Sequence, residues 1–354
     1  MDMFGFDNFL QPNDFADFES MNTQKLINNQ YVYDFAKESD FSVKTKRRIR
    51  KLISKLSRKL PALQDWTSEG SRLMFDEVVS TNEYDFIILF YVFHANLLKN
   101  SRTKAKKIYI MEDCVFLQQY FWESPNKPCL KLGNLLDEEL ERLKYFDELV
   151  NVSYEEKIMY EKFTGRHVHY LPYLLQDDVK PSTIPLGKRR WDVMFIGFNN
   201  KFNVEGLLWF TEKVYPLLSS EIRIVFVGSV TSALEKTYSN INVIPYASDL
   251  DEIFDNVKVS ICPMLNGTGM KVKVLESMAR GLPVVCNERG VDGLPDKMEC
   301  GCLVTQSPTE FANYINRLVT DEEYHADVSK KISKYYAGLY ERNNYSNVLQ
   351  KLLI

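Results

Sequence analysis

The chain has 354 residues and a mass of 41.3 kDa, which is enough for two domains with separate cores. Its 45% hydrophobic and 26% charged residues are typical of a soluble globular protein and exclude disorder throughout. The net charge of −4 gives no overall reason to expect nucleic acid as a partner. The longest apolar run, Phe86 to Phe93, is far shorter than the roughly 20 residues needed to span a bilayer.

Residues 1–40 are acidic and aromatic and have no clean pattern of strands and helices. Residues 42–60 contain nine Lys or Arg and no acid, and their apolar side chains recur at helical spacing. A helix of this kind suits an anionic membrane surface. The alternative is a helix that packs its apolar stripe on a core and leaves its basic face in water.

From residue 85 onward, short β-rich runs alternate with helical patterns, which predicts parallel α/β architecture. The second half is regular enough to predict a Rossmann-like sheet. The expected strands are Asp85–Phe93, Lys107–Met111, Leu149–Ser153, His167–Leu171, Asp192–Phe198, Arg223–Val227, Asn242–Tyr246, Lys258–Met264, Pro283–Asn287 and Cys302–Thr305.

A polar, proline-containing stretch at residues 176–190 has no periodicity and predicts a linker. We therefore expect a first domain at 1–175, a second at 191–335, and a final helix at 336–354. Six cysteines do not form a disulfide framework, and Cys262 and Cys286 lie in apolar runs as expected for reduced core residues. We expect a cytoplasmic protein, with peripheral attachment to the inner face of the membrane if residues 42–60 bind lipid.

The segment from Ile261 to Leu294 is the most informative part of the sequence. A buried strand is followed by a turn containing Gly267 and Gly269, and a helix is predicted from about Met270 to Arg280. A helix start presents free N–H groups and a positive dipole end, which favour an anion. Lys271 and Lys273 are misplaced there for helix stability, but they suit a diphosphate. The segment matches neither the Walker A nor the G-x-G-x-x-G pattern.

The run GTGMKVKVLESMARGLPVV, from Gly267 to Val285, resembles the donor-binding motif of retaining GT-B glycosyltransferases of family 4, the glycosyl transferases group 1. The resemblance covers about residues 84–350 and is strongest over 191–305. It implies two Rossmann-like domains facing across a cleft. It also implies metal-independent transfer of a sugar from a UDP- or GDP-linked donor to a glycan or lipid-linked acceptor, with no cofactor.

Carried over residue by residue, the resemblance implies a donor site on the second domain. Lys271 and Lys273 would hold the diphosphate, and Glu276 the ribose hydroxyls. Gly197 would open a loop at the leaving phosphate. The remaining residues of the implied donor site are Asn203, Ile244, Tyr246, Asn266, Gly267, Thr268 and Gly269.

Two catalytic candidates come from the first half of the chain. His94 and Asp113 each follow a predicted strand, where open α/β sheets bind ligands. In the family, an Asp or His at such a place often meets the transferred sugar or acceptor. The alternatives are a capping role for Asp113 and an ordinary helix-start role for His94. His325, in an acidic helical stretch, is expected on the surface.

The sequence departs from the family pattern at two places. Thr268 stands where many members carry the first of two glutamates, with Glu276 as the second. The opening strand, glycine-rich loop and helix of the family's first domain are not evident, so we expect this domain to lack about one βα unit. These departures leave a second interpretation, a non-catalytic GT-B partner of an active transferase. A nucleotide-sugar 2-epimerase is a third.

Overall fold

The computed structural model describes residues 1–6, 28–34, 62–126, 129–173, 179–342 and 345–353. The basic segment at 42–60, which was predicted as a membrane-binding or core-packing helix, lies outside the described residues. The chain divides into two compact units: residues 1–109 with 115–148, and residues 110–114 with 149–354. The linker predicted at 176–190 stays a prediction, as do the domain limits drawn from it.

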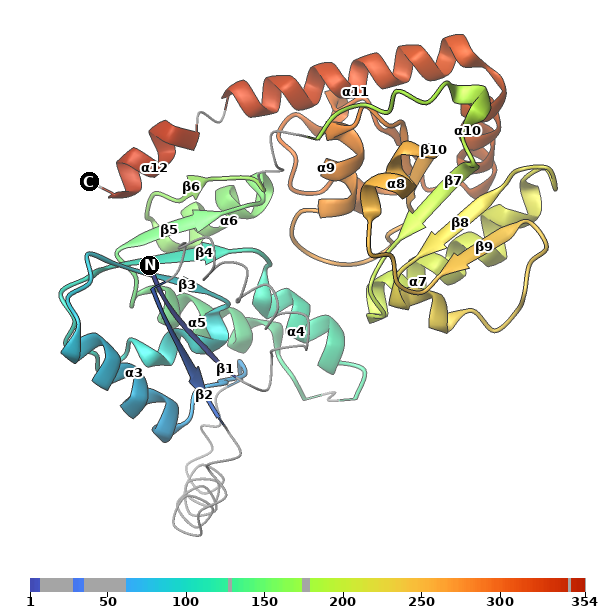
Figure 1. The fold of residues 1–354 in the computed structure, drawn as a ribbon. Helices are drawn as coiled ribbons and strands as arrows, with labels where there is room; N and C mark the ends of the chain where they lie inside the picture. The colour runs from blue at the N-terminus through green and yellow to red at the C-terminus, as the bar shows by residue number, and fades with distance from the viewer. Residues whose placement is uncertain (7–27, 35–61, 127–128, 174–178, 343–344, 354) are drawn as a thin grey trace. The chain divides into compact units, whose positions relative to one another are not determined.

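The elements before residue 175 form a two-stranded parallel sheet and a four-stranded sheet (Figure 1). The first sheet pairs β1 with β2, and the second has the order β3-β4-β5-β6. The bounds are β1 Asp2–Phe6, β2 Asn29–Tyr33, α3 Glu69–Thr81, β3 Phe86–Phe90, β4 Lys106–Met111, α4 Val115–Glu123, α5 Leu132–Leu143, β5 Glu148–Asn151, α6 Tyr154–Thr164 and β6 His169–Tyr170.

Strand β1 bears on the prediction that the first domain lacks a βα unit. Among the described residues, β1 pairs only with β2 and is not part of the four-stranded sheet. Tyr84 donates a hydrogen bond to Asp2 at 2.6 Å, and Phe4 packs edge-on against Phe75 of α3. The missing unit stays a prediction.

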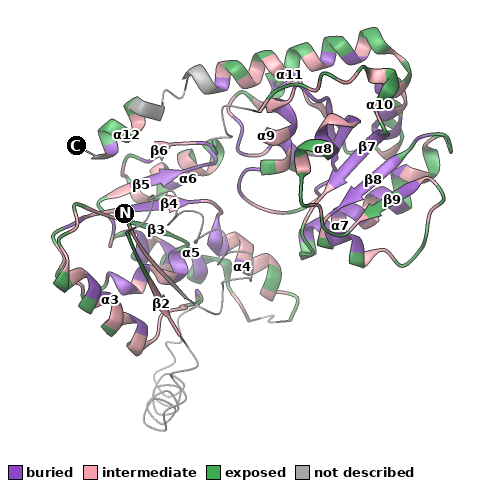
Figure 2. Cartoon of the chain, in the orientation of Figure 1, coloured by how far each residue is buried: buried purple, intermediate pink, exposed green. Residues whose placement is uncertain are grey.

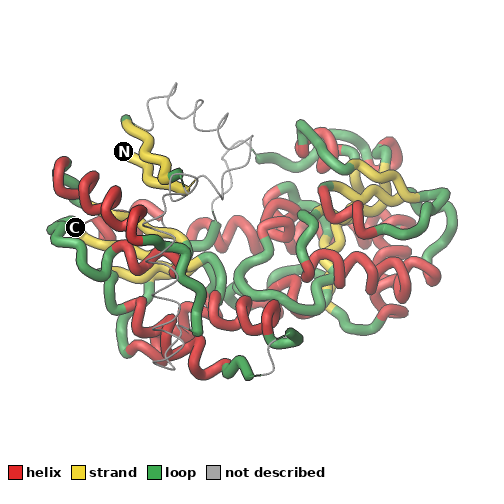
Figure 3. Tube along the Cα trace, turned by 90° about the horizontal axis from the view of Figure 1, so that it is seen from below, coloured by secondary structure: helices red, strands yellow, loops and turns green. Residues whose placement is uncertain are grey.

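The elements after residue 190 form a six-stranded parallel sheet with helices between its strands (Figure 3). The bounds are β7 Trp191–Ile196, α7 Lys201–Trp209, β8 Ile224–Val227, β9 Ile241–Ile244, α8 Leu250–Asp255, β10 Val257–Cys262, α9 Val272–Ala279, β11 Val284–Cys286, β12 Leu303–Val304, α10 Pro308–Thr320, α11 Glu322–Arg342 and α12 Tyr345–Leu353. All ten strands expected from the sequence are present, with ends shifted by up to three residues, and the Rossmann-like prediction is confirmed.

Both faces of the six-stranded sheet are covered, which explains why its strands are almost continuously apolar (Figure 2). Because side chains alternate along a strand, neighbours face opposite ways. Met194 packs in a cluster with Val225 and Phe254, whereas Phe195 lies edge-on to Phe226 on the other face. Cys262 and Cys286 are buried free thiols, as predicted.

A buried ion pair fastens the start of β7. Asp192 is 3% exposed, and its carboxylate accepts from Arg223 Nε and Nη2 at 3.0 Å each and from Lys258 Nζ at 2.8 Å. Burial by itself would raise the pKa of Asp192, but the hydrogen bonds from Arg223 and Lys258 outweigh it and hold the pKa below its usual value.

We expect Asp192→Asn to lower the free energy of unfolding by about 2–3 kcal/mol, because it breaks a buried, hydrogen-bonded charge pair. Because the pKa of Asp192 is lower in the folded state than in the unfolded state, the carboxylate stabilises the fold at pH values above the unfolded pKa of about 3.9. This contribution is lost as the pH falls through the folded-state pKa. Urea denaturation at pH 7 and below pH 4 tests both points. Asp327→Asn, in an exposed pair with Lys331, is the control. Equal losses in both variants would contradict the prediction.

Candidate functional site

The site lies at the carboxyl end of the six-stranded sheet, between β7 and β10. The sheet order β12-β11-β10-β7-β8-β9 reverses direction at this pair. The loops that follow the two strands therefore leave toward opposite sides, and such a switch point is where open α/β sheets bind ligands. The two loops are residues 197–200 and 263–271.

Two glycines shape the loop after β10. Gly267 has φ +126° and Gly269 has φ +68°, both in the region that favours glycine. A Cβ on Gly269 would lie 2.5 Å from the Glu112 carbonyl oxygen and 2.6 Å from Asp113 Oδ1. A Cβ on Gly267 would meet nothing closer than 3.8 Å. Gly269 is therefore required by both its conformation and its close approach to the segment after β4, and Gly267 by its conformation.

Lys271 stands at the N-cap of α9 and closes the loop. It is 8% exposed, and its Nζ donates to the carbonyl oxygens of Thr268 at 2.9 Å and Gly269 at 3.0 Å. The Lys271 side chain forms no cap hydrogen bond with the first amides of α9. A positive charge, a helix start and a glycine turn thus converge, which favours an anionic ligand. The helix begins at Val272 rather than at about Met270, and Gly281, with φ +61°, follows its end as predicted.

Lys273, in the first turn of α9, is connected to the loop after β7 through Asn203 of α7. Its Nζ donates to Asn203 Oδ1 at 2.7 Å and lies 4.7 Å from the centre of the Phe195 ring. Asn203 Nδ2 in turn donates to the carbonyl oxygen of Phe198 at 2.9 Å, and a Cβ on Gly197 would lie 2.9 Å from Asn203 Cγ. Burial lowers the pKa of Lys273, and the charge of Lys271 lowers it further. A bound anion would offset both effects.

Glu276 lies one turn beyond Lys273 on α9. Burial raises the pKa of its carboxyl, with Arg280 and Lys273 opposing that shift and Asp251 adding to it. Arg280 stacks over Phe254 at 4.2 Å and forms an ion pair with Asp251. A half-buried carboxylate with this surrounding can accept hydrogen bonds from ligand hydroxyls.

Two carboxylates from the segments after β4 and β5 contact the glycine-rich loop. Asp113 Oδ1 accepts from Thr268 Oγ1 at 3.1 Å, and Glu156 Oε1 accepts from the Gly269 amide at 2.7 Å. Glu155, beside Glu156 in the first turn of α6, accepts from the Gly293 amide at 3.3 Å and pairs with Lys297. The contact of Asp113 was not predictable in detail, and Glu156 was missed altogether. Acids in a first turn also occur for helix stability alone, so the sequence carried no signal for it.

The remaining donor-site candidates lie at the same end of the sheet. Ile244 ends β9, and its carbonyl oxygen accepts from Gly228 N at 2.8 Å. Tyr246 is 72% exposed just beyond it. Asn266 Nδ2 donates to Glu205 of α7 at 3.1 Å. Their predicted ligand contacts stay predictions.

His94 belongs to the other unit and is described with it. It follows β3 in a short 3₁₀ turn (Val92–Leu97), next to Tyr91, whose φ of +60° is unusual for a residue other than glycine. Burial lowers the pKa of His94 to about 4, although Asp65 acts in the opposite direction. The imidazole is therefore neutral near pH 7. Its ring packs edge-on against Trp66.

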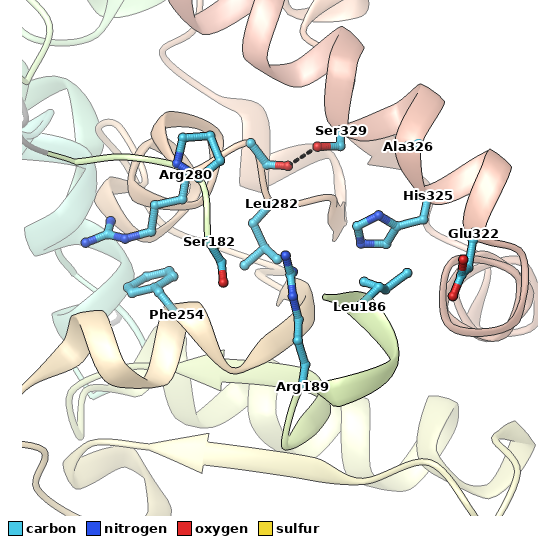
Figure 4. Close-up of a pocket in the computed structure, with 12 residues that line it drawn as sticks. Ser182, Leu186, Arg189, Phe254, Arg280, Leu282, Glu322, His325, Ala326 and Ser329 are labelled. Atoms are coloured by element: carbon cyan, nitrogen blue, oxygen red, sulfur yellow. Dashed lines mark hydrogen bonds between the residues drawn. The ribbon is translucent and has the colours of Figure 1, made fainter. Parts of the chain in front are cut away.

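A cavity of about 310 Å³ lies at the opposite end of α9 (Figure 4). His325 lines it, and this corrects the prediction that His325 is a surface residue. It is 7% exposed, and its Nε2 lies 2.9 Å from the Lys258 carbonyl oxygen, because α11 packs this face on the sheet domain. Arg189 and Ser329 at the same cavity donate to the carbonyl oxygens of Val257 and Gly281. These bonds fasten the chain entering β7 and helix α11.

The described residues contain no group of three or more His, Cys, Asp or Glu side chains placed to hold a metal ion. None of the helices in the described part of the chain has the length and apolar character to cross a membrane.

Comparison with known proteins identifies the class. Residues 190–321 match the family described as glycosyl transferases group 1. The chain is 25% identical over 281 residues to an uncharacterized 44.6 kDa protein in the cps region of Klebsiella pneumoniae, covering 69% of this chain and 68% of that protein.

Solved structures share the fold at low sequence identity. Anabaena HepE, in complex with UDP, is 13% identical and has a TM-score of 0.62, with 99% of each chain covered. WaaG, a glycosyltransferase involved in lipopolysaccharide biosynthesis, is 12% identical with a TM-score of 0.58 and 95% of each chain covered. Staphylococcus aureus TarM is 11% identical with a TM-score of 0.63, and the chain spans 80% of its own length and 59% of that of TarM.

The fold is therefore GT-B, the arrangement of two Rossmann-like domains that the motif implied. The chain is a glycosyltransferase, and its residues 190–321 match the glycosyl transferases group 1 family. Its assignment to family 4 in particular stays a prediction.

Proposed function

We propose that the chain transfers a sugar from a UDP- or GDP-linked donor to a glycan or lipid-linked acceptor, with retention of configuration and without a metal ion. The observation that carries this proposal is the convergence of Lys271, Lys273 and the start of α9 at the switch point of the sheet. HepE supports a uridine donor, since its structures contain UDP and UDP-glucose. The cps-region protein and WaaG support a role in polysaccharide or glycolipid biosynthesis.

The leaving group explains the need for these charges. When the bond from the sugar to the diphosphate breaks, negative charge develops on the phosphate oxygens, and fixed cations and N–H groups stabilise it. Lys271 and Lys273 would supply the cations and the loop at Gly197 would admit the phosphate. Glu276 would accept from the ribose hydroxyls, with the base near Ile244 and Tyr246. With lysines in this role, a metal ion is not required to neutralise the diphosphate.

The transferred sugar would lie toward Thr268 and Asp113. Thr268 replaces the first glutamate of the family pattern, and its hydroxyl donates a hydrogen bond to Asp113 Oδ1 at 3.1 Å. Asp113 is the stronger catalytic candidate on these contacts. His94, neutral near pH 7, stays a candidate for contact with sugar or acceptor. We also propose cytoplasmic residence, with residues 42–60 as the segment for attachment to an anionic membrane.

A panel of UDP-, GDP-, ADP- and CMP-sugars in a thermal-shift assay, with chelator present, tests this function. Binding to the folded state stabilises by RT ln(1 + [L]/Kd), about 2.7 kcal/mol at a hundredfold excess over Kd. We expect a shift with UDP- or GDP-sugars. NMR of the sugar released by slow hydrolysis should show the α- or β-configuration of the donor unchanged. A shift only with added divalent metal, or an inverted product, would contradict the proposed mechanism.

The replacement of the first glutamate by Thr268 favours a second candidate, a non-catalytic GT-B partner of an active transferase. In this second role the chain would bind the nucleotide sugar through Lys271. It would release no sugar from the donor, either alone or with glycan and lipid-linked acceptors. The same panel followed by product analysis separates the two functions.

A further inference from the structure

Glu156 contacts the candidate donor site through a backbone group that Lys271 also contacts. The amide N–H of Gly269 and the carbonyl of Thr268 belong to one peptide group. The N–H donates to Glu156 Oε1 at 2.7 Å, and the carbonyl oxygen accepts from Lys271 Nζ at 2.9 Å. The two opposite charges therefore hold this peptide from its two ends.

The loop needs such a restraint. Gly267 and Gly269 both have positive φ and offer no side chain to anchor the backbone. The position of Lys271 Nζ is set by its hydrogen bonds to two carbonyl oxygens of this loop. A rotation of the Thr268–Gly269 peptide would therefore redirect the ammonium group. Hydrogen bonds to a charged partner are the stronger kind, and one to a carboxylate opposes this rotation.

The helix that carries Glu156 is itself fixed. Ser153 caps α6 by accepting from the Glu156 amide at 3.4 Å. Tyr154 N donates to the Gly293 carbonyl oxygen at 2.9 Å, and Glu155 pairs with Lys297. The carboxylate of Glu156 thus projects from a first turn held by independent bonds, which suits it to set the position of a loop.

We propose that Glu156 is a positioning residue that orients Lys271 toward the donor diphosphate through the Thr268–Gly269 peptide. This inference rests on the proposed function of Lys271 as a diphosphate ligand. Glu156 touches neither nucleotide nor sugar in this role. The nucleoside part of the donor, bound elsewhere on the sheet edge, does not depend on it.

Isothermal titration with UDP or GDP, whichever the wild type binds, and with the matching nucleoside tests the role. We expect Glu156→Ala to weaken diphosphate binding by about tenfold, the loss of one charge-assisted hydrogen bond, and to leave nucleoside binding unchanged. Glu156→Gln keeps an oxygen that accepts from Gly269 and should recover most of the affinity. Glu161→Gln, which removes a carboxylate of the same helix that accepts from Lys157 and from the Val168 amide, is the matched control and should bind like the wild type.

A double-mutant cycle with Lys271→Ala measures directly whether Glu156 acts through Lys271. If Glu156 acts through Lys271, Glu156→Ala should cause little further loss in the Lys271→Ala background. Additive losses, or wild-type affinity in Glu156→Ala, would overturn the inference while the effect of Lys271→Ala alone still supports the proposed function. If the wild type binds no nucleoside diphosphate, both fall. If Glu156→Ala does not fold, Glu156→Gln and Glu156→Asp test the inference instead. The Asp side chain is one methylene shorter, so Glu156→Asp should bind diphosphate more weakly than Glu156→Gln. The reverse order of affinities would overturn the inference.

Discussion

Lys271→Ala is expected to reduce kcat/KM for sugar transfer by at least about 100-fold, or about 2.7 kcal/mol of transition-state stabilisation. The reason is that Lys271 is a buried cation at the N-cap of α9, where the developing charge of the leaving diphosphate would lie. Nucleoside diphosphate affinity should fall with it. Steady-state kinetics with the donor identified by the panel, and calorimetry with its nucleotide, measure the two effects.

Lys271 also closes the loop, so its charge and its hydrogen bonds must be separated. Lys271→Gln retains a donor for the carbonyl oxygens of Thr268 and Gly269 but removes the charge. It should keep the thermal stability of the wild type and still lose transfer. Lys213→Ala, which changes an exposed lysine of the same domain, is the control. A Lys271→Gln variant with wild-type kcat/KM would show that the charge is not used.

Gly269→Ala is expected to abolish donor binding. Its Cβ would lie 2.5 Å from the Glu112 carbonyl oxygen, at a φ of +68° that costs an L-residue about 1–2 kcal/mol. The backbone must shift, and with it the amide held by Glu156 and the carbonyls held by Lys271. Calorimetric titration with nucleoside diphosphate, on protein shown to be folded by circular dichroism, measures the effect.

Gly165→Ala is a matched control for the backbone strain alone. Gly165 follows α6 with a φ of +66°, and a Cβ there meets nothing within 4 Å. This variant should lose about 1 kcal/mol of stability and bind the nucleotide as the wild type does. Equal binding losses in the two variants would mean that strain rather than the contact with residues 112–113 accounts for the effect.

The sheet of the second half was predictable because its strands are buried on both faces. Runs such as that ending at Ile196 and that ending at Cys262 are mostly apolar, and each is followed by a glycine- or proline-containing turn. Their ends were less predictable. The strand expected at Lys258–Met264 starts one residue earlier, at Val257, and it ends at Cys262 because Pro263 has no amide N–H to continue the pairing.

The candidate site was predictable where its residues are consecutive. Residues 266–276 carry the turn, the cations and the acid in one segment, so their grouping follows from local structure. Glu156 lies more than 100 residues from Gly269, and no local pattern connects the two. His325 was misplaced for a related reason. Its acidic neighbours indicate solvent, but the opposite face of α11 packs on the sheet, and only tertiary contacts decide which face carries the histidine.

The loop between β10 and α9 is proposed to bind the diphosphate of a nucleotide sugar. A crystal structure of the full chain with the nucleoside diphosphate selected by the panel tests it most directly. We expect phosphate oxygens within hydrogen-bond distance of Lys271 Nζ or Lys273 Nζ, and the ribose hydroxyls within hydrogen-bond distance of Glu276. A nucleotide bound elsewhere, such as in the cavity beside His325, with both lysines still on their present protein partners, would contradict it.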